Sequence, residues 1–409
     1  MRVLFTTWDW SGHFYPLVPL GWALRAAGHE VLVATDPGFA PAVVRAGLPA
    51  LAVGPRFDSA QVLTEQIKKR GWVPKAPARR TADATEDTAR TRRRSLLGLR
   101  IAAQAASAQA DELVRFCGEW HPDLVVYEPL GFAGPLVARL FGVPAVRHLW
   151  GIDMTSGVAA FESDIVGELS ARFGLDEIGI NGTMTLDPCP ARVQVADGVA
   201  RHPVRLVPYN GPSVAPGWLK DGTERPRICV SWGNSLDRFG FGDLVLAPLV
   251  AEALASIDVE VILAVSAGQR ATFGPLPDNV RHAGPVPLNL LLPSCAALVH
   301  QGGAGTMMAG LLNGLPQLVI AHMPEGALHG YRIEESGTGR FLPGPEATAE
   351  LIRENVLALL SDPAFAEAAR EARSDILARP SSGTVARQLA GLVSSGLVSS
   401  ERATVAATR

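Results

Sequence analysis

Short apolar, β-branched runs alternate with helical patterns along this chain, and few folds accommodate such an alternation. In the first half, the runs at residues 2–7, 30–35 and 123–127 are too continuously apolar for strands of a half-exposed sheet. Segments with apolar residues at helical spacing, such as residues 133–141, separate these runs. The pattern predicts an α/β fold built on doubly wound parallel sheets with helices on both faces.

The alternation stops once and then resumes, which predicts two Rossmann-like domains that face each other across a cleft. The stretch between them, PVRLVPYNGPSVAPGWLKDGTE, is rich in Pro and Gly and has no helical period. We expect ligands at the carboxyl ends of the strands. The predicted boundaries are an N-terminal domain at 1–205, a linker at 206–225, a C-terminal domain at 226–378, a helix within 379–395 that packs back on the first domain, and a flexible tail at 396–409.

Composition excludes several classes of protein. The 409 residues are 47% hydrophobic, and their net charge of −3 gives no overall attraction to nucleic acid or to an anionic membrane. No apolar run approaches the roughly 20 residues that span a bilayer, and no signal peptide is recognised. The four cysteines form no metal-binding pattern, so we expect a cytoplasmic protein without a metal site. The basic stretch at 68–94 is interpreted as a solvated loop, with an anion-binding or docking patch as the alternative.

The segment LVHQGGAGTMMAGLLNG is the most informative for chemistry. A strand ends at its histidine, a glycine-rich turn follows, and a helix begins near Ala304. Glycines allow a ligand to approach the backbone, and the first helical N–H groups attract negative charge, so an anion site is predicted. The residues expected to meet the anion are His300, as an imidazole donor, and Gly302, Gly303, Gly305 and Thr306. A tight turn that needs glycine only for steric reasons is the alternative.

This segment differs from two common nucleotide-binding motifs. A dinucleotide fingerprint requires a third glycine, but position 308 is Met. A P-loop requires a Lys-Ser/Thr pair, which does not follow here. The anion site also lies in the second half of the chain, so NAD and ATP are both disfavoured, and we expect no cofactor.

A candidate base lies in the first domain. His13 follows the first strand, at the edge of the sheet where chemistry is expected, and a neutral imidazole can accept a proton from a hydroxyl. Glu128 follows the strand DLVVY and so opens onto the same edge, where a carboxylate could orient the imidazole. The alternative is that His13 only starts a helix and Glu128 is a surface carboxylate.

Taken together, these residues resemble the nucleotide-sugar-dependent glycosyltransferases of the GT-B fold, and in particular the actinomycete branch that decorates antibiotics and other polyketides. The likeness covers essentially the whole chain. It rests on SGHFYPLVPL, PDLVVYE, VPYNG, VSWGNS and PVPLNLLLPSCAALVHQGGAGT. The resemblance implies direct displacement with inversion, with His13 as the catalytic base. Glu128 stands where the family usually has an aspartate, which alters the reach of the carboxylate.

For the sugar donor, the resemblance implies a binding site in the second domain. Its residues are Gly233, Asn234, Val286, Leu288, His300, Gly302, Gly303, Gly305, Thr306 and Glu325. The stretch PEGALHG departs from the family pattern, because Gly326 replaces a glutamine and His329 replaces an asparagine. The missing glutamine amide would suit a sugar with fewer hydroxyls, so a deoxysugar on a thymidine diphosphate (TDP) carrier is expected.

The expected activity is therefore metal-independent transfer of a sugar from a nucleoside diphosphate to a small natural-product acceptor. Trp8, Trp10 and Phe14 are the candidate acceptor-binding residues, with a simple core role as their alternative. A nucleotide-sugar epimerase and an inactive partner of another transferase remain as rival functions. No nucleic-acid or membrane partner is expected, whereas a homodimer or an auxiliary protein is possible.

Overall fold

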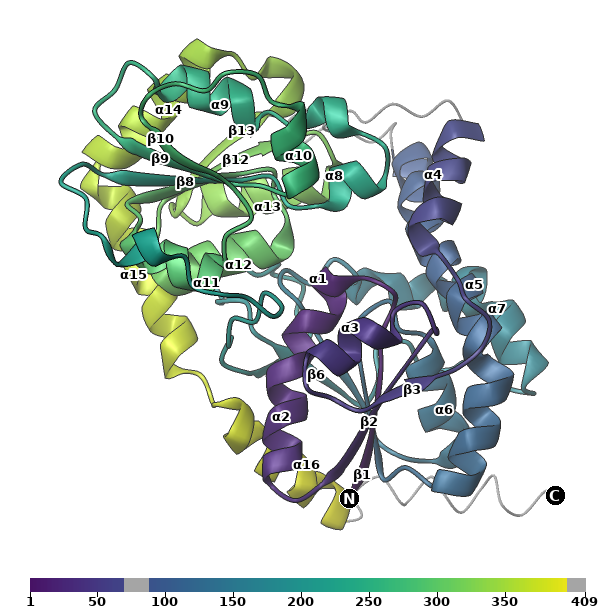
Figure 1. The fold of residues 1–409 in the computed structure, drawn as a ribbon. Helices are drawn as coiled ribbons and strands as arrows, with labels where there is room; N and C mark the ends of the chain where they lie inside the picture. The colour runs from purple at the N-terminus through teal and green to yellow at the C-terminus, as the bar shows by residue number, and fades with distance from the viewer. Residues whose placement is uncertain (70–87, 396–409) are drawn as a thin grey trace.

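The structure is a computed structural model that describes residues 1–69 and 88–395. Within these residues the chain forms two α/β domains, each built around one parallel sheet (Figure 1). The strand order is β3-β2-β1-β4-β5-β6-β7 in the first sheet and β10-β9-β8-β11-β12-β13 in the second. The predicted fold class of two doubly wound parallel-sheet domains is confirmed. Among the described residues, no helix is long and apolar enough to span a bilayer.

The first domain holds seven strands and the helices that cover them. The strands are β1 (Arg2–Thr6), β2 (Glu30–Thr35), β3 (Ala50–Ala52), β4 (Leu124–Tyr127), β5 (Ala145–His148), β6 (Met184–Asp187) and β7 (His202–Pro203). The helices are α1 (Ser11–Phe14), α2 (Val18–Ala26), α3 (Ala40–Arg45), α4 (Ser59–Lys69), α5 (Thr88–Trp120), α6 (Ala133–Phe141) and α7 (Glu162–Arg172). The solvated-loop interpretation of 68–94 is wrong at both ends, which belong to α4 and α5, and residues 70–87 lie outside the described residues.

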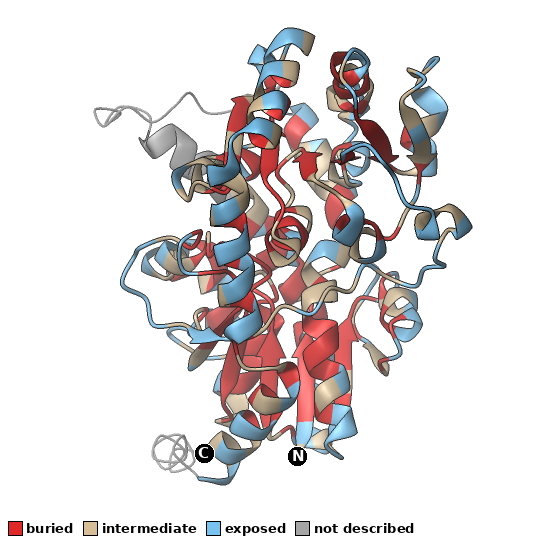
Figure 2. Cartoon of the chain, turned by 90° about the vertical axis from the view of Figure 1, so that its left-hand side faces the viewer, coloured by how far each residue is buried: buried red, intermediate tan, exposed pale blue. Residues whose placement is uncertain are grey.

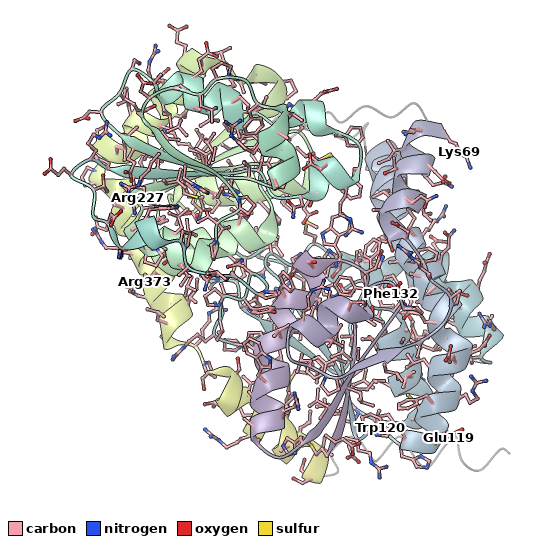
Figure 3. The ribbon with its side chains drawn as sticks, viewed as in Figure 1. Lys69, Glu119, Trp120, Phe132, Arg227 and Arg373 are labelled. Carbon is pink, nitrogen blue, oxygen red and sulfur yellow. The ribbon has the colours of Figure 1, made fainter. Side chains whose placement is uncertain are left out.

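Both faces of the first sheet are buried, as the continuous apolar runs predict. Leu4 packs into a core with Phe132, which is labelled in Figure 3, beneath α5 and α6. Its neighbour Phe5 packs on the opposite face, with Leu20 of α2. Alternate residues of a strand point to opposite faces, so an apolar residue at every position fills both layers. Figure 2 shows the strands as a buried interior under more exposed helices.

The second domain repeats this layered arrangement. Its strands are β8 (Arg227–Ser231), β9 (Glu260–Ala264), β10 (Val280–Gly284), β11 (Ala297–His300), β12 (Gln317–Ala321) and β13 (Gly339–Pro343). Its helices are α8 (Ser235–Arg238), α9 (Ala247–Leu254), α10 (Ala267–Thr272), α11 (Leu288–Leu291), α12 (Ala304–Asn313), α13 (Pro324–Glu335), α14 (Ala349–Ser361) and α15 (Pro363–Ala378). Helix α9 begins at Ala247, and Pro248 occupies its first turn.

The chain returns to the first domain at its C-terminal end. Helix α16 (Ser382–Ser394) follows α15 and lies against α2 (Figure 1). Val385, Ala386 and Leu389 are buried in the same core as Phe5. Residues 382–394 thus form a helix that packs on the first domain. The predicted tail at 396–409 lies outside the described residues.

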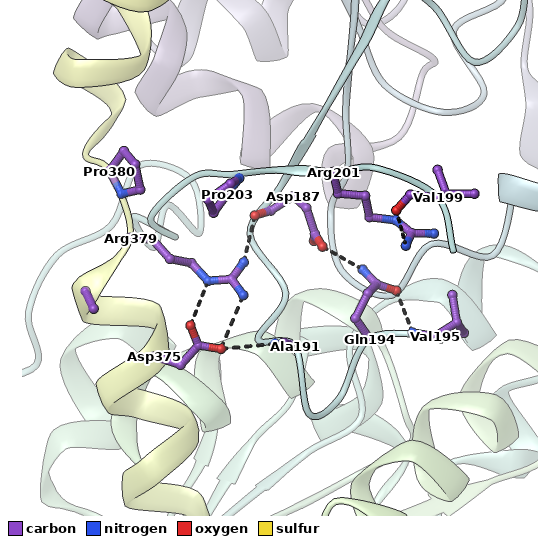
Figure 4. A pocket seen from close by; sticks show the side chains of 11 residues that line it. Asp187, Ala191, Gln194, Val195, Val199, Arg201, Pro203, Asp375, Arg379 and Pro380 are labelled. Carbon is purple, nitrogen blue, oxygen red and sulfur yellow. Dashed lines mark hydrogen bonds and ion pairs between the residues drawn. The ribbon is translucent and has the colours of Figure 1, made fainter. Parts of the chain in front are cut away.

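Polar contacts join the two domains near the place where the chain returns from α15 to α16. Arg332 of α13 donates to the carbonyl oxygens of Val193 and Gln194, at 2.9 and 2.6 Å. Arg379 donates to the carbonyl oxygen of Asp187 at 2.8 Å and lines a cavity of about 550 Å³ beside it (Figure 4). Burial raises the pKa of the Asp187 carboxyl to about 6. The relative placement of the domains therefore depends on these contacts as well as on the linker.

Candidate active site

His13 and Glu128 meet at the carboxyl edge of the first sheet. His13 lies in α1, just beyond β1, and Glu128 directly follows β4. Because β1 and β4 pair with Thr6 opposite Tyr127, the segments after these strands emerge side by side. The His13 Nδ1 and Glu128 Oε2 atoms are 2.9 Å apart. The extra methylene of glutamate, compared with aspartate, thus leaves an ordinary hydrogen-bond distance.

The buried carboxylate of Glu128 is held in place by the backbone. Its Oε1 accepts from the Trp8 N–H at 3.3 Å, and its Oε2 accepts from the Leu130 N–H at 2.9 Å. An ionised carboxylate only accepts hydrogen bonds, so the His13 Nδ1 carries the shared proton. The His13 Nε2 is then the nitrogen with a free lone pair. The His13 side chain is 16% exposed, whereas that of Glu128 is fully buried. This arrangement leaves the basic nitrogen available for an acceptor hydroxyl.

Tryptophan rings surround the imidazole of His13. The Trp150 ring stacks on it, with ring centroids 4.0 Å apart and an interplanar angle of 30°. The Trp8 ring meets it edge-on at 5.6 Å, and the Trp10 ring is tilted at 6.5 Å. Trp8 and Trp10 are half-buried, as expected for residues that line a site. The sequence analysis did not predict a role for Trp150, although its position shortly after β5 was the available signal.

Phe14 does not belong to this group, so the prediction that it binds the acceptor is wrong. Its side chain is fully buried and packs edge-on against Phe39 in the core of the first domain. Successive residues of a helix point about a third of a turn apart, so His13 faces the site while Phe14 faces the core.

The predicted donor-binding glycines lie at the carboxyl edge of the second sheet. Gly302 has a φ of +89°, and Gly303 is the N-cap of α12, without a side-chain cap. The first N–H groups of α12 are therefore uncapped by any side chain there, and they carry the positive end of the helix dipole. Gly305 is exposed, with nothing within 4 Å of an added Cβ, and Thr306 is half-buried one residue later.

A second turn lies beside this one. Gly233, with a φ of +55°, and the exposed Asn234 follow β8. Since β8 pairs with β11, with Ser231 opposite His300, the two turns are neighbours. Val286 and Leu288 follow β10, farther along the same edge, and both are half-buried. The structure therefore places these predicted donor residues along one edge of one sheet.

Gln301 lies between the two turns and was missed. A Cβ added to Gly233 would be 2.6 Å from the Gln301 Nε2, and one added to Gly303 would be 3.2 Å from the same atom. Among the described residues, the buried Oε1 of Gln301 has no hydrogen-bond partner. Its position within the glycine-rich segment was the only sequence signal for it.

The prediction that His300 donates a hydrogen bond to the bound anion is not supported. His300 is fully buried; its Nδ1 accepts from the Gly302 N–H at 3.1 Å, and its Nε2 donates to the Gln317 Oε1 at 2.9 Å. Burial lowers the pKa of His300 to about 3 and keeps the ring neutral. The ring of His329 holds the same residue through its carbonyl, because its Nδ1 donates to the Gly302 carbonyl oxygen at 2.6 Å. The two histidines thus fix the turn from beneath.

Helix α13 packs closely against the glycine-rich turn. A Cβ added to Gly326 would be 2.6 Å from the Gln301 carbonyl oxygen, and one added to Gly302 would be 2.5 Å from the Gly326 Cα. No side chain therefore fits at Gly326, where the resemblance implies a glutamine. Glu325, one residue earlier, is exposed in the first turn of α13. Within the described residues, no group of three or more His, Cys, Asp or Glu side chains is placed to hold a metal ion.

The neutral His300 predicts a loss of stability in mild acid. Its folded pKa of about 3 lies below the ordinary value of 6.5. Between these pH values His300 is therefore protonated in the unfolded chain and neutral in the folded protein. Its contribution to stability is complete above pH 6.5 and decreases as the pH falls toward 3. We expect this residue to lower the free energy of unfolding by about 2 kcal/mol as the pH falls from 7 to 5. Urea unfolding at the two pH values measures the loss.

His300→Gln provides the control for this prediction, because its amide oxygen can still accept from the Gly302 N–H. This variant should lose less stability than the parent chain over the same pH interval. His148, whose pKa burial lowers to about 4, leaves a similar slope in both proteins and cancels in the comparison. An equal pH dependence in the two proteins would show that His300 is not held neutral.

Two parallel-sheet domains, with His13 beside Glu128 at the edge of one sheet and a glycine-rich turn at the edge of the other, have the organisation of a GT-B glycosyltransferase. Comparison with known families agrees. Residues 22–233 match the N-terminal domain described as erythromycin biosynthesis protein CIII-like, and residues 248–392 match the C-terminal domain of the same description. The chain belongs to this family, whose members include glycosyltransferases of antibiotic biosynthesis in actinomycetes.

Individual relatives are similar over nearly the whole chain. The 3-alpha-mycarosylerythronolide B desosaminyl transferase of Saccharopolyspora erythraea is 35% identical, over 94% of this chain and 96% of its own. The L-demethylnoviosyl transferase of Streptomyces niveus is 40% identical, over 84% of this chain and 85% of its own. The spinosyn rhamnosyltransferase SpnG, solved with thymidine diphosphate, superposes with a TM-score of 0.79 at 29% identity, over 95% of this chain and 100% of SpnG.

Proposed function

We propose that this glycosyltransferase moves a deoxysugar from a TDP carrier onto a hydroxyl of a small natural-product aglycone, with inversion at the sugar carbon. The contact between His13 and Glu128 is the observation that carries the proposal. It places a basic nitrogen at the carboxyl edge of the first domain, in a partly exposed ring of aromatic side chains. The relatives named above are a desosaminyl, an L-demethylnoviosyl and a rhamnosyl transferase, the last of them solved with TDP, which supports the substrate classes.

In the proposed reaction, the His13 Nε2 accepts the proton of the acceptor hydroxyl as its oxygen attacks the anomeric carbon. The bond between that carbon and the diphosphate oxygen breaks in the same step, and the electron pair leaves with TDP. Attack opposite the leaving group inverts the configuration. Glu128 stabilises the imidazolium that forms and keeps its ring in one orientation.

The leaving diphosphate is stabilised, in this proposal, by the backbone of the second domain. The N–H groups at the start of α12 point out of a turn whose N-cap is Gly303 and which has no side-chain cap. These fixed dipoles cost no reorganisation as negative charge develops on the diphosphate. Gly233 and Asn234 bring a second loop to the same place. A donor site of this kind can act without a metal ion.

The proposed preference for a deoxysugar rests on Gly326. The contact of this glycine with the Gln301 carbonyl leaves no room for the amide that the resemblance implies at this position. A donor site without that hydrogen-bonding group loses less with a sugar that lacks hydroxyls than with a fully hydroxylated one. The tryptophans around His13 favour an acceptor with a flat or apolar body.

Calorimetric titration with TDP and with uridine diphosphate, each with and without a chelator, tests the proposed function. We expect TDP to bind more tightly than uridine diphosphate, with an affinity that chelation leaves unchanged. Loss of binding on chelation would contradict metal independence. Failure of folded protein to bind either nucleotide would contradict the donor site and favour an inactive partner protein. Release of TDP without an acceptor product would favour an epimerase.

A further inference from the structure

The first and second domains are in direct contact beside His13. The Phe239 ring of the second domain stacks on the Trp10 ring of the first, with centroids 5.1 Å apart and an interplanar angle of 21°. The Arg238 guanidinium lies 4.2 Å from the centroid of the same ring. The Arg238 Nη1 also donates to the Asp9 carbonyl oxygen at 3.3 Å. One arginine and one phenylalanine thus contact two consecutive residues across the domain boundary.

Each side of this contact is joined to a functional segment. Trp10 is the N-cap of α1, and its carbonyl oxygen accepts from the His13 N–H at 3.0 Å. On the other side, Arg238 is the last residue of α8, a single turn of helix whose N-cap is Asn234. The start of the helix that bears the base is therefore tied, through one side chain, to the turn expected to hold the diphosphate.

The carboxylate of Asp9 stabilises the position of Arg238. The carboxylate is 9% exposed; its Oδ2 accepts from the Ser59 N–H at 3.1 Å, and its Oδ1 has no partner among the described residues. Burial raises the pKa of Asp9, and the carboxylate of Asp36 acts in the same direction. The Arg238 Nη2 is 3.8 Å from the Asp9 Oδ2. A guanidinium with unused donors next to a poorly satisfied buried carboxylate favours a close domain contact.

We propose that Arg238 is a positioning residue, which holds the turn at Gly233 and Asn234 in register with the helix that bears His13. This inference rests on the proposed function, because it assumes that TDP binds at that turn. When the nucleotide binds and restricts the motion of α8, the contacts of Arg238 then also restrict the motion of Asp9 and Trp10. The base and the leaving group are thereby aligned across two domains whose sheets share no strand.

Hydrogen exchange tests this coupling with TDP as the only ligand. In the parent protein, TDP is expected to slow exchange both at residues 233–239 and at residues 9–14. In Arg238→Ala, the slowing at 9–14 should disappear, while the Kd for TDP stays within about threefold. Arg238→Lys retains the charge but not the planar guanidinium that lies over the Trp10 ring, so it should recover part of the effect. The rate of sugar transfer should fall on the order of 10- to 100-fold in the alanine variant.

Arg340→Ala is the matched control, because Arg340 lies over the Phe365 ring at 5.6 Å and donates to the Asn355 Oδ1 at 3.3 Å, both within the second domain. It should behave like the parent protein. Slowing at 9–14 that persists in Arg238→Ala, or that is equally lost in Arg340→Ala, would overturn the inference. So would TDP binding to the parent without any effect at 9–14. Absence of TDP binding to the parent would instead refute the proposed donor site, and the inference with it. Phe239→Leu repeats the test if Arg238→Ala does not fold.

Discussion

A His13→Ala variant is expected to transfer sugar about a thousandfold more slowly than the parent protein, with TDP binding unchanged. The His13 Nε2 has a free lone pair at this edge of the first domain, and removal of the imidazole takes away the proposed proton acceptor for the hydroxyl. TDP affinity is unaffected, because the glycine turns at Gly233 and Gly303 lie in the other domain. Turnover assays with calorimetry on the same preparation measure both quantities.

Glu128→Gln is the informative companion to this variant. The amide retains the shape of the carboxylate, but its NH₂ group can donate to the His13 Nδ1 and so place the imidazole proton on Nε2, the wrong nitrogen. We expect a loss of transfer similar to that in His13→Ala. Normal turnover in His13→Ala would remove the general-base role. Loss of TDP binding in that variant would show that the replacement had disturbed the fold instead.

A Gly305→Ala variant is expected to be more stable than the parent protein and to bind TDP about tenfold more weakly or worse. Beyond its chain neighbours and its own helix backbone, the added methyl group meets no atom of the described residues within 4 Å, and alanine favours helix over glycine by about 0.5–1 kcal/mol. The same methyl group would obstruct a diphosphate that approaches the backbone at the start of α12. Stability and affinity should therefore change in opposite directions, which thermal unfolding and calorimetry can show.

Gly391→Ala is the matched control, because Gly391 also lies in a helix, is exposed, and has nothing within 4 Å of an added Cβ. It should gain similar stability without any change in TDP affinity. An unchanged Kd for TDP in Gly305→Ala would place the diphosphate elsewhere. Gly302→Ala would be less informative, because its methyl group would meet the Gly326 Cα at 2.5 Å and so damage the fold itself.

The departures of this chain from the expected family pattern are physically connected. Gly326 lets α13 approach the glycine-rich turn, and from that position the His329 ring reaches the Gly302 carbonyl at 2.6 Å. A side chain at 326 would push the helix away and break that hydrogen bond. Gly326 and His329, which are separate departures from the family pattern in the sequence, thus stabilise the glycine-rich turn together.

Local patterns in the sequence determined much of the architecture. The strand at 30–35 and the helix at 133–141 were predicted with the bounds that the structure shows. The spacing of apolar residues and a glycine at the helix end are both local signals, which can be recognised within one segment. The same holds for the start of α12 at Ala304, where glycines precede a helical run. Where the local signal was weak, as in the basic stretch at 68–94, the prediction was wrong, because both ends of the stretch belong to helices.

Only the tertiary structure decided which side each functional residue faces. His13 and Phe14 are adjacent, yet one faces the site and the other the core, because the direction of each side chain depends on what packs against α1. His300 turns inward because Gln317, on the neighbouring strand, offers it a partner. The contact between Arg238 and Asp9 joins residues 229 positions apart. No local pattern encodes such pairs, because they form only when distant strands of one sheet, or the two domains, come together in space.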